Sequence, residues 1–308
     1  MDLTAITLTE LRYVVAAADT GHFGRAASRC HVSQPTLSAQ IKKLEETLGV
    51  QLFERTPKRV QVTAVGEQVV ERARVMLDEL QGIGDLARGQ HEPLAGPLRL
   101  GVIPTLGPYL LPWLVPPLQK AYPRLRLVLR EGLTATLLDD LVAHRLDVAI
   151  VALPVGTPGI AVEPLFDEPF WVAVPAKHVL AKRTQLREGD LDGHRVLLLT
   201  EGHCLRDQAL AICGDGRSGR DDDDYRATSL ETLRHMVAAG LGCTLLPALA
   251  LRGVPKGMVT RPFKAPSPHR RIGLAWRRSF PGVDAVHALA AFVRGTLPPG
   301  VHLVKEGD

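Results

Sequence analysis

Three short amphipathic runs open the chain, each with apolar residues at the three- and four-residue spacing of a helix. The first follows Thr9, a candidate N-cap, and stops at Thr20-Gly21, and the second covers residues 23–30. The third begins after Ser33, a residue type that caps helices well. Only His31-Val32 separates the second run from the third, so this spacing predicts a helix-turn-helix.

The polar face of the third predicted helix mixes amides, hydroxyls and cations. Because the apolar stripe packs inward, this face stays outside, where such groups can bond the base edges and phosphates of DNA. The alternative is a packing module whose polar face is only solvated. The candidate DNA-contacting residues of this helix are Ser33, Gln34, Pro35, Thr36, Ser38, Gln40 and Lys42.

A basic β-hairpin is predicted next. Three cations flank Thr56-Pro57 and precede the alternating Val60 and Val62, a pattern typical of a strand pair. Cations on such a wing would contact the phosphate backbone of DNA. These cations are Arg55, Lys58 and Arg59. Residues 1–63 are therefore predicted to form a winged helix-turn-helix.

A longer amphipathic run predicts a linker helix over residues 64–90. Its apolar residues alternate at spacings of four and three, which is typical of a seam that packs on a partner helix. We expect this helix to dimerise the chain, and the alternative is that it packs only on its own domain. Residues 91–97 contain two prolines and a glycine and are expected to form a hinge. The seam residues are Val69, Ala73, Met76, Leu80, Ile83 and Ala87.

Beyond the hinge, short β-rich runs alternate with helical ones, which predicts an α/β fold with a mainly parallel sheet and helices on both faces. The chain is expected to leave a first lobe for a second and return, giving a two-lobed regulatory domain. Such folds bind ligands at the carboxyl ends of strands, where Thr105 and Thr134 lie, although both could be ordinary turn or cap residues. The expected strands are 98–103, 125–130, 148–153, 170–174 and 196–199. The regulatory domain is expected over 98–308, with lobe I at about 98–167 and 268–302 and lobe II at about 168–267.

Composition narrows the class of protein. The chain has 308 residues, 45% hydrophobic and 23% charged, as expected for about two soluble globular domains. No stretch approaches the roughly 20 apolar residues that cross a bilayer, and Met1-Asp2-Leu3 does not open a signal sequence, so we expect a cytoplasmic protein with no membrane partner. The net charge is +4, but residues 1–90 hold 11 Lys or Arg against 11 Asp or Glu. DNA binding must therefore be argued from placement of cations rather than from total charge.

The candidate chemistry centres on cysteine. Four cysteines in a chain of this length do not make a disulfide scaffold. Residues 202–214 predict one helix with Cys204 in its first turn, where unpaired amides stabilise a thiolate and His203 and Arg206 can add donors or positive charge. A thiolate attacks peroxide and becomes a sulfenic acid, which condenses with a second thiol. Cys204 is thus a candidate sensor of oxidants.

The second cysteine of this segment, Cys213, lies nine residues further on, so an intact helix separates the two Cα atoms by about 13 Å. A disulfide needs a separation of about 4.4–6.8 Å, and its formation would require unwinding of the helix. The glycine- and aspartate-rich residues 214–224 are expected to form a flexible or hydrated loop. Cys30 and Cys243 lie in apolar contexts and are expected to be buried as small apolar residues. The same purely structural role is the alternative to redox chemistry for Cys204 and Cys213.

Several motifs resemble those of LysR-type transcriptional regulators, in particular residues 23–27 (FGRAA) and 33–38 (SQPTLS). Further segments resemble the hydrogen peroxide-sensing subfamily, so the similarity covers nearly the whole chain. These segments are 101–112, 165–169, 202–209 and 226–234. The resemblance implies a winged helix-turn-helix, a linker helix and a two-lobed regulatory domain like that of periplasmic binding proteins.

By this resemblance, peroxide would oxidise Cys204, and Cys213 would resolve it as a disulfide that rearranges a DNA-bound tetramer and activates antioxidant genes. The implied partners are double-stranded promoter DNA, hydrogen peroxide, further copies of the chain in a dimer or tetramer, RNA polymerase, and glutaredoxin or thioredoxin as reductant. No cofactor and no metal are implied. The residues matching the peroxide pocket are Thr105, Thr134, His203, Asp207 and Arg270. The sequence departs from the subfamily after Cys213 and at Cys243, a position that is usually aliphatic.

Three alternatives remain. One is a LysR-type regulator that binds a metabolite between its lobes, with incidental cysteines. Another is a thiol peroxidase. The third is a nucleotide-binding enzyme, since residues 214–219 fit G-x-G-x-x-G, but this motif follows a helix and precedes four aspartates that would repel phosphate. The sequence has neither the spacing of a zinc site nor a G-x-S-x-G elbow, so we expect no metal and no hydrolase triad.

Overall fold

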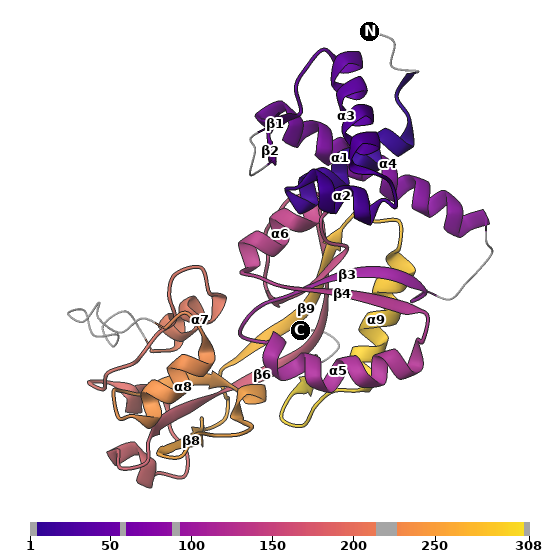
Figure 1. Ribbon diagram of the computed structural model, residues 1–308. Coiled ribbons are helices and arrows are strands. Elements are labelled where there is room, and N and C mark those ends of the chain that lie inside the picture. The colour runs from indigo at the N-terminus through magenta and orange to yellow at the C-terminus, as the bar shows by residue number, and fades with distance from the viewer. Residues whose placement is uncertain (1–4, 56–59, 88–92, 214–226, 305–308) are drawn as a thin grey trace. The chain divides into compact units, whose positions relative to one another are not determined.

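The computed structural model describes residues 5–55, 60–87, 93–213 and 227–304 (Figure 1). Lys58, Arg59 and the G-x-G-x-x-G segment lie outside these residues. The chain divides into two compact units, Met1–His91 with Ala143–Arg145, and Glu92–Val142 with Leu146–Asp308. Within the part of the chain that is described, no helix has the length and apolar character to span a membrane.

The first unit confirms the predicted helix-turn-helix and its hairpin. The helix α3 begins, as predicted, after Ser33, whose hydroxyl accepts a hydrogen bond from the Thr36 amide at 3.3 Å. The helix α1 begins earlier than predicted, because Thr7 rather than Thr9 caps it and forms a capping box with Glu10. The elements are α1 (Leu8–Thr20), α2 (Phe23–Arg29), α3 (Gln34–Leu48), the antiparallel strands β1 (Phe53–Arg55) and β2 (Val60–Val62), and α4 (Ala64–Ala87).

A single core holds this unit together. Val14 and Ala17 of α1 and Leu37 and Ile41 of α3 have no exposed surface. Val14, Leu37 and Ile41 are apolar positions whose spacing predicted the helices, whereas Ala17 was not among them. Burial of the α3 stripe leaves the opposite face of that helix outside. Cys30 is only half-buried, and the prediction of its burial was wrong because it caps the end of α2 rather than lying within the helix.

The linker helix α4 is divided along its length. Its first half packs on its own unit, since Val70 and Ala73 are buried and Arg74 forms an ion pair with Asp19. The next seam positions, Met76, Leu80 and Ile83, are 53%, 41% and 63% exposed. The first half therefore packs on its own unit, as the alternative interpretation expected, whereas the second half presents apolar side chains that its own unit does not cover, and dimerisation through it stays a prediction.

The second unit is built on a six-strand path in the order β10-β6-β9-β5-β3-β4, with β7 and β8 paired to the far end of β6. The strands are β3 (Gly96–Val102), β4 (Leu125–Glu131), β5 (Val148–Leu153), β6 (Ile160–Pro175), β7 (Thr244–Pro247), β8 (Met258–Pro262), β9 (His269–Arg277) and β10 (His302–Leu303). The helices are α5 (Gly107–Ala121), α6 (Thr134–Val142), α7 (Cys204–Cys213), α8 (Leu230–Ala238) and α9 (Val283–Gly295), with short 3-10 turns at Val179–Lys182, Glu188–Leu191 and Ala248–Leu251.

The prediction of a mainly parallel sheet was wrong. Among the strand pairs of the described residues, β3–β4 and β3–β5 alone are parallel, whereas β9 pairs antiparallel with β5 and β6, and β7, β8 and β10 pair antiparallel with β6. The reason is that β6 carries the chain from one lobe to the other and β9 returns beside it. The expected strand 196–199 is reduced to isolated bridges of Val196 to Cys243 and Leu199 to Ala227.

Two hydrophobic cores flank this crossover. Phe166 of β6 packs in the core of lobe I, formed with β3, β5, α5, α6 and α9. Phe170, four residues along the same strand, packs in the core of lobe II, formed with β7, α7 and α8. A single strand therefore fixes where the two lobes meet, and the segments before α5, α6 and α7 converge near this junction.

Candidate functional site

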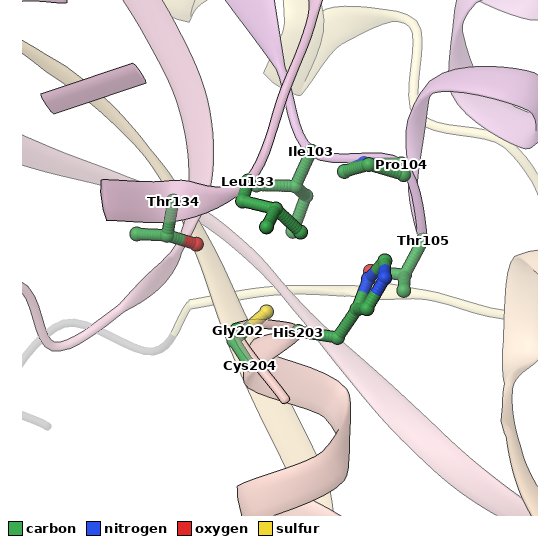
Figure 2. A pocket seen from close by; sticks show the side chains of 8 residues that line it. All are labelled: Ile103, Pro104, Thr105, Leu133, Thr134, Gly202, His203 and Cys204. Carbon is green, nitrogen blue, oxygen red and sulfur yellow. The ribbon is translucent and has the colours of Figure 1, made fainter. Parts of the chain in front are cut away.

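A small pocket lies in the second unit where three loop-to-helix connections meet (Figure 2). One connection joins β3 to α5, the second leads into α6, and the third leads into α7. Figure 2 shows the Cys204 sulfur, the His203 ring and the Thr134 hydroxyl directed toward the space between these connections. The lining residues are Ile103, Pro104, Thr105, Leu133, Thr134, Gly202, His203 and Cys204.

Cys204 is the first residue of α7, as the sequence predicted, and its thiol is free and half-buried. The preceding Gly202 has φ +90, a left-handed conformation that residues with side chains rarely adopt, and a Cβ there would lie 3.0 Å from the Leu133 side chain. This turn aims the start of α7 at the pocket. The unpaired amides of the first helical turn favour an anion at that end of the helix.

The pocket contains polar atoms without a protein partner. The hydroxyl oxygen of Thr134 and Nδ1 of His203 are buried, and neither has a hydrogen-bond partner among the described residues. The hydroxyl oxygen of Thr105 accepts a bond from Arg270 at 2.9 Å, so its own hydrogen is left for another acceptor. An unpaired buried polar group costs about 1–3 kcal/mol. A small molecule that both donates and accepts hydrogen bonds would therefore satisfy this site.

His203 is an uncharged member of the pocket. Its side chain is 7% exposed, and this burial lowers the pKa of the imidazole below its usual 6.5, although a hydrogen bond with the Thr228 backbone acts in the opposite direction. A lowered pKa favours the neutral ring, so of the two contributions expected from the sequence, donors or positive charge, His203 is suited to that of a donor. Arg206, the other residue expected to add donors or positive charge, donates a hydrogen bond to the Leu199 carbonyl oxygen at 3.4 Å. The neutral ring can still orient a ligand by hydrogen bonding.

The five residues predicted for the pocket occupy different places. Thr105, Thr134 and His203 line it together with Cys204. Arg270 does not line it but reaches it through Thr105, whose carbonyl oxygen it also contacts at 3.1 Å. Asp207 is exposed on α7 and is not among the lining residues.

Other contributors were missed by sequence reasoning. Leu133 and Ile103 form apolar walls of the pocket. The sequence could have indicated both residues, because each lies beside the end of a strand. Glu168, buried on β6, binds Arg270, and its place in a strand core gave no sign of this.

Cys213 closes α7 at the opposite end and is 1% exposed in the core of lobe II. The intact helix therefore separates the Cα atoms of Cys204 and Cys213 by about 13 Å in rise. Cys243 is buried in the same core and donates to the Arg195 carbonyl oxygen at 3.1 Å. Burial, with a smaller effect of the neighbouring Cys213, raises the pKa of Cys243 to about 12. No disulfide joins any of the four cysteines, all of which lie in the described residues, and Cys204 is the one that lines the pocket.

The predicted DNA-contacting residues that the structure describes lie along the first nine residues of α3, at its N-cap and in β1. Gln34, Pro35 and Thr36 are exposed in its first turn, whereas Ser38 and Gln40 are half-buried. Ser33 is exposed and caps the helix, and Lys42 is exposed and lies 3.7 Å from Glu46. Arg55 lies in β1 of the wing. The structure leaves the start of α3 open to solvent, as a groove-reading helix requires. Over the described residues, no group of three or more His, Cys, Asp or Glu could hold a metal ion.

Comparison with known proteins identifies the family. Residues 8–67 match the bacterial regulatory helix-turn-helix of the LysR family, and residues 91–298 match the LysR substrate binding domain. The chain belongs to the LysR family of regulators. Within this family it is of the OxyR type. It is 45% identical over 295 residues to the DNA-binding transcriptional dual regulator OxyR of Escherichia coli (strain K12), which covers 95% of this chain and 96% of that protein.

Further relatives of this LysR-family chain are also of the OxyR type. A probable hydrogen peroxide-inducible genes activator of Streptomyces viridosporus is 42% identical over 94% of this chain and 93% of its own length. Full-length OxyR of Pseudomonas aeruginosa, solved with a cysteine-to-aspartate substitution, has a TM-score of 0.80 at 45% identity and covers 94% of this chain and 97% of its own. A cysteine-to-serine mutant of Corynebacterium glutamicum OxyR, solved with hydrogen peroxide bound, has a TM-score of 0.65 at 36% identity, covering 94% of this chain and 92% of that one.

Replacing His203 with asparagine should flatten the loss of folding stability in acid. Because burial lowers the pKa of His203 below 6.5, the unfolded chain binds this proton more tightly than the folded chain. The stability that the neutral ring contributes is complete above pH 6.5 and is lost as the pH falls through the lowered pKa. Denaturant unfolding of both proteins from about pH 7 to about pH 4 measures the slope. Equal slopes would contradict this assignment.

Proposed function

We propose that this protein is a transcriptional regulator that detects hydrogen peroxide through Cys204 and answers by forming a disulfide with Cys213. The observation that carries the proposal is the placement of Cys204 at the start of α7, in a pocket whose Thr134 and His203 each hold an unpartnered buried polar atom. Hydrogen peroxide has the paired donors and acceptors that such a pocket suits. The names of the relatives support the same signal.

The first step is a two-electron oxidation of sulfur. The Cys204 thiolate attacks one peroxide oxygen, the S–O bond forms and the O–O bond breaks, leaving a sulfenic acid and a hydroxide that takes a proton to become water. The amides of the first turn of α7 stabilise the attacking anion. Thr105, Thr134 and the neutral His203 hold the peroxide in line with the sulfur. Arg270 contributes by holding Thr105. Asp207 belongs to the proposed set from its exposed position on α7, outside the lining of the pocket.

The second step remodels lobe II. The Cys213 thiol attacks the sulfenic sulfur, the S–S bond forms and the S–O bond breaks, and the oxygen leaves as water with the Cys213 proton. Because α7 holds the two residues at opposite ends, the helix must unwind and Cys213 must leave the core. A dithiol reductant, glutaredoxin or thioredoxin, returns two electrons and two protons and restores both thiols. The disulfide thereby couples oxidation to a change of shape.

The first unit reads DNA in this proposal. The exposed first turn of α3 enters the major groove, and the wing contacts phosphate. The exposed half of α4 pairs two copies of the chain, and a further pairing builds a tetramer whose rearrangement recruits RNA polymerase to antioxidant genes. Such a regulator works in the cytoplasm, where DNA and thiol reductants are both available. The DNA-reading unit favours a sensor over a thiol peroxidase that turns over its substrate, so we propose that the protein is not an enzyme.

Replacing Cys204 with serine should abolish the peroxide-induced disulfide while leaving DNA binding by the reduced form unchanged. A non-reducing thiol map before and after a stoichiometric dose of hydrogen peroxide measures the disulfide. Replacement of Cys243, which is equally free but sealed in the core, by alanine is the matched control and should leave the response intact. A Cys204→Ser protein that still switched would exclude this cysteine as the sensor.

Two substitutions should separate sequence reading from general affinity for DNA. Gln34→Ala should relax sequence preference, because Gln34 is exposed in the first turn of α3. Arg55→Ala should weaken binding to all DNA and reduce the salt slope by about one. Binding isotherms on matched and scrambled operators at several salt concentrations measure both effects. The same loss of specificity in both variants would show that the reading face is wrongly assigned.

Replacing Ile83 with glutamate should raise the dissociation constant of the dimer at least ~10-fold, because the apolar surface that a partner would bury is lost. Sedimentation over a range of protein concentrations measures this constant. Val179→Glu is the matched control, since Val179 and Ile83 are both 63% exposed. An unchanged oligomeric state in the Ile83 variant would show that the exposed half of α4 is not the dimer seam.

A further inference from the structure

A buried ion pair stands directly behind the pocket. The side chains of Glu168 on β6 and Arg270 on β9 are both 0% exposed, and the two residues are Cα partners across the strand pair. Oε2 of Glu168 accepts from Nε of Arg270 at 2.9 Å and lies 2.8 Å from Nη2. Oε1 of Glu168 accepts from the Leu249 amide at 2.8 Å. Both carboxylate oxygens are therefore occupied, so the carboxylate is fixed in position.

The guanidinium of Arg270 links the fixed carboxylate of Glu168 to Thr105 in the pocket. Nη1 of Arg270 donates to the Thr105 hydroxyl at 2.9 Å, and Nη2 donates to the Thr105 carbonyl at 3.1 Å. The planar guanidinium has a rigid arrangement of donors, so a carboxylate on one edge sets the direction of the opposite edge. The place of Thr105 thus depends on Glu168 through Arg270.

The hydrogen bond also decides what Thr105 can offer a ligand. A hydroxyl has one hydrogen, and an arginine can only donate. Because the Thr105 oxygen accepts from Arg270, its hydrogen is available to an acceptor in the pocket that Thr105 lines. When a thiolate attacks peroxide, negative charge develops on the departing oxygen, and a donor already aimed there stabilises that charge.

We propose that Glu168 is a positioning residue for peroxide reduction: by fixing Arg270, it holds Thr105 as the hydrogen-bond donor to the departing oxygen. This inference rests on the proposed function of Cys204. Glu168 does not line the pocket and acts only through Arg270 and Thr105. No proton passes through Glu168 in this step, and the O–O bond breaks as described above.

The adjacent residues of the same two strands provide a matched control. Asp167 and Arg271 are also Cα partners and form an ion pair, with Nε to Oδ1 at 2.9 Å. Their side chains are partly exposed, at 17% and 25%, and successive residues of a strand point to opposite faces. Asp167→Asn therefore removes one carboxylate charge from the same strand pair without touching the Thr105 contact.

The test compares the second-order rate of Cys204 oxidation by hydrogen peroxide in the full-length wild type, Glu168→Gln and Asp167→Asn, by quenching and mass spectrometry. Glu168→Gln keeps an acceptor for the Leu249 amide but loses the charge that holds Arg270. We expect its rate to fall at least ~10-fold, because misplacement of a positioned donor by about 1 Å has effects of this size. Asp167→Asn should stay within about twofold of the wild type.

Two further measurements distinguish positioning from a general structural effect. Alkylation of Cys204 by iodoacetamide requires the same thiolate but no donor to a departing oxygen, so its rate in Glu168→Gln should match that of the wild type. The double variant Glu168→Gln/Arg270→Gln leaves no unpaired buried charge. It should regain the melting temperature that Glu168→Gln loses but keep the slow peroxide rate, and it replaces the single variant if that one does not fold.

The outcomes separate the two levels of the argument. A wild type whose Cys204 does not react with peroxide faster than an ordinary thiol contradicts the proposed function itself. A reactive wild type with equally reactive folded Glu168 variants overturns only the role of Glu168. The same is true if alkylation slows in parallel with oxidation, because the change would then lie in the thiol rather than in the donor.

Discussion

The helix α7 holds Cys204 at its first residue and Cys213 at its last, and the proposed mechanism depends on this separation. At the first position the sulfur faces the pocket, and at the last it is packed among the side chains of a hydrophobic core. Neither sulfur can reach the other while the backbone hydrogen bonds of the helix persist. In the proposed mechanism a bond between them and the native packing of α7 exclude each other, so a chemical event in the pocket becomes a structural event.

The strand crossover explains why the pocket lies where residues of the two lobes meet. The pocket draws residues from the ends of three segments, two in lobe I and one in lobe II, while the antiparallel pair β6–β9 joins the lobes behind it. Arg270 and Glu168 lie on these joining strands, so the pair that holds Thr105 belongs to the strand pair that connects the lobes. In the proposed mechanism the change begins in α7, on the lobe II side of the pocket.

Sequence pattern predicted much of this, and the reasons for its failures are physical. Helical spacing located α1 to α4 and placed Cys204 at a helix start, because burial of one stripe is a local property of the sequence. The cap of α1 was misplaced, although Thr7 and Glu10 form the T-x-x-E signature of a capping box. Strand direction and the role of Glu168 could not be read, since both depend on which distant segments pair.

The burial of Cys213 has a consequence for timing. A thiol that is 1% exposed cannot meet a sulfenic acid until its end of α7 opens, whereas Cys204 can be oxidised in the folded protein. In the proposed mechanism the rate of the first step therefore depends on oxidant concentration, and the rate of the second depends on local unfolding of α7. A cellular reductant that reduces the sulfenic acid before α7 opens would prevent the disulfide from forming. Lobe II would then change its structure under sustained exposure to oxidant but not under brief exposure.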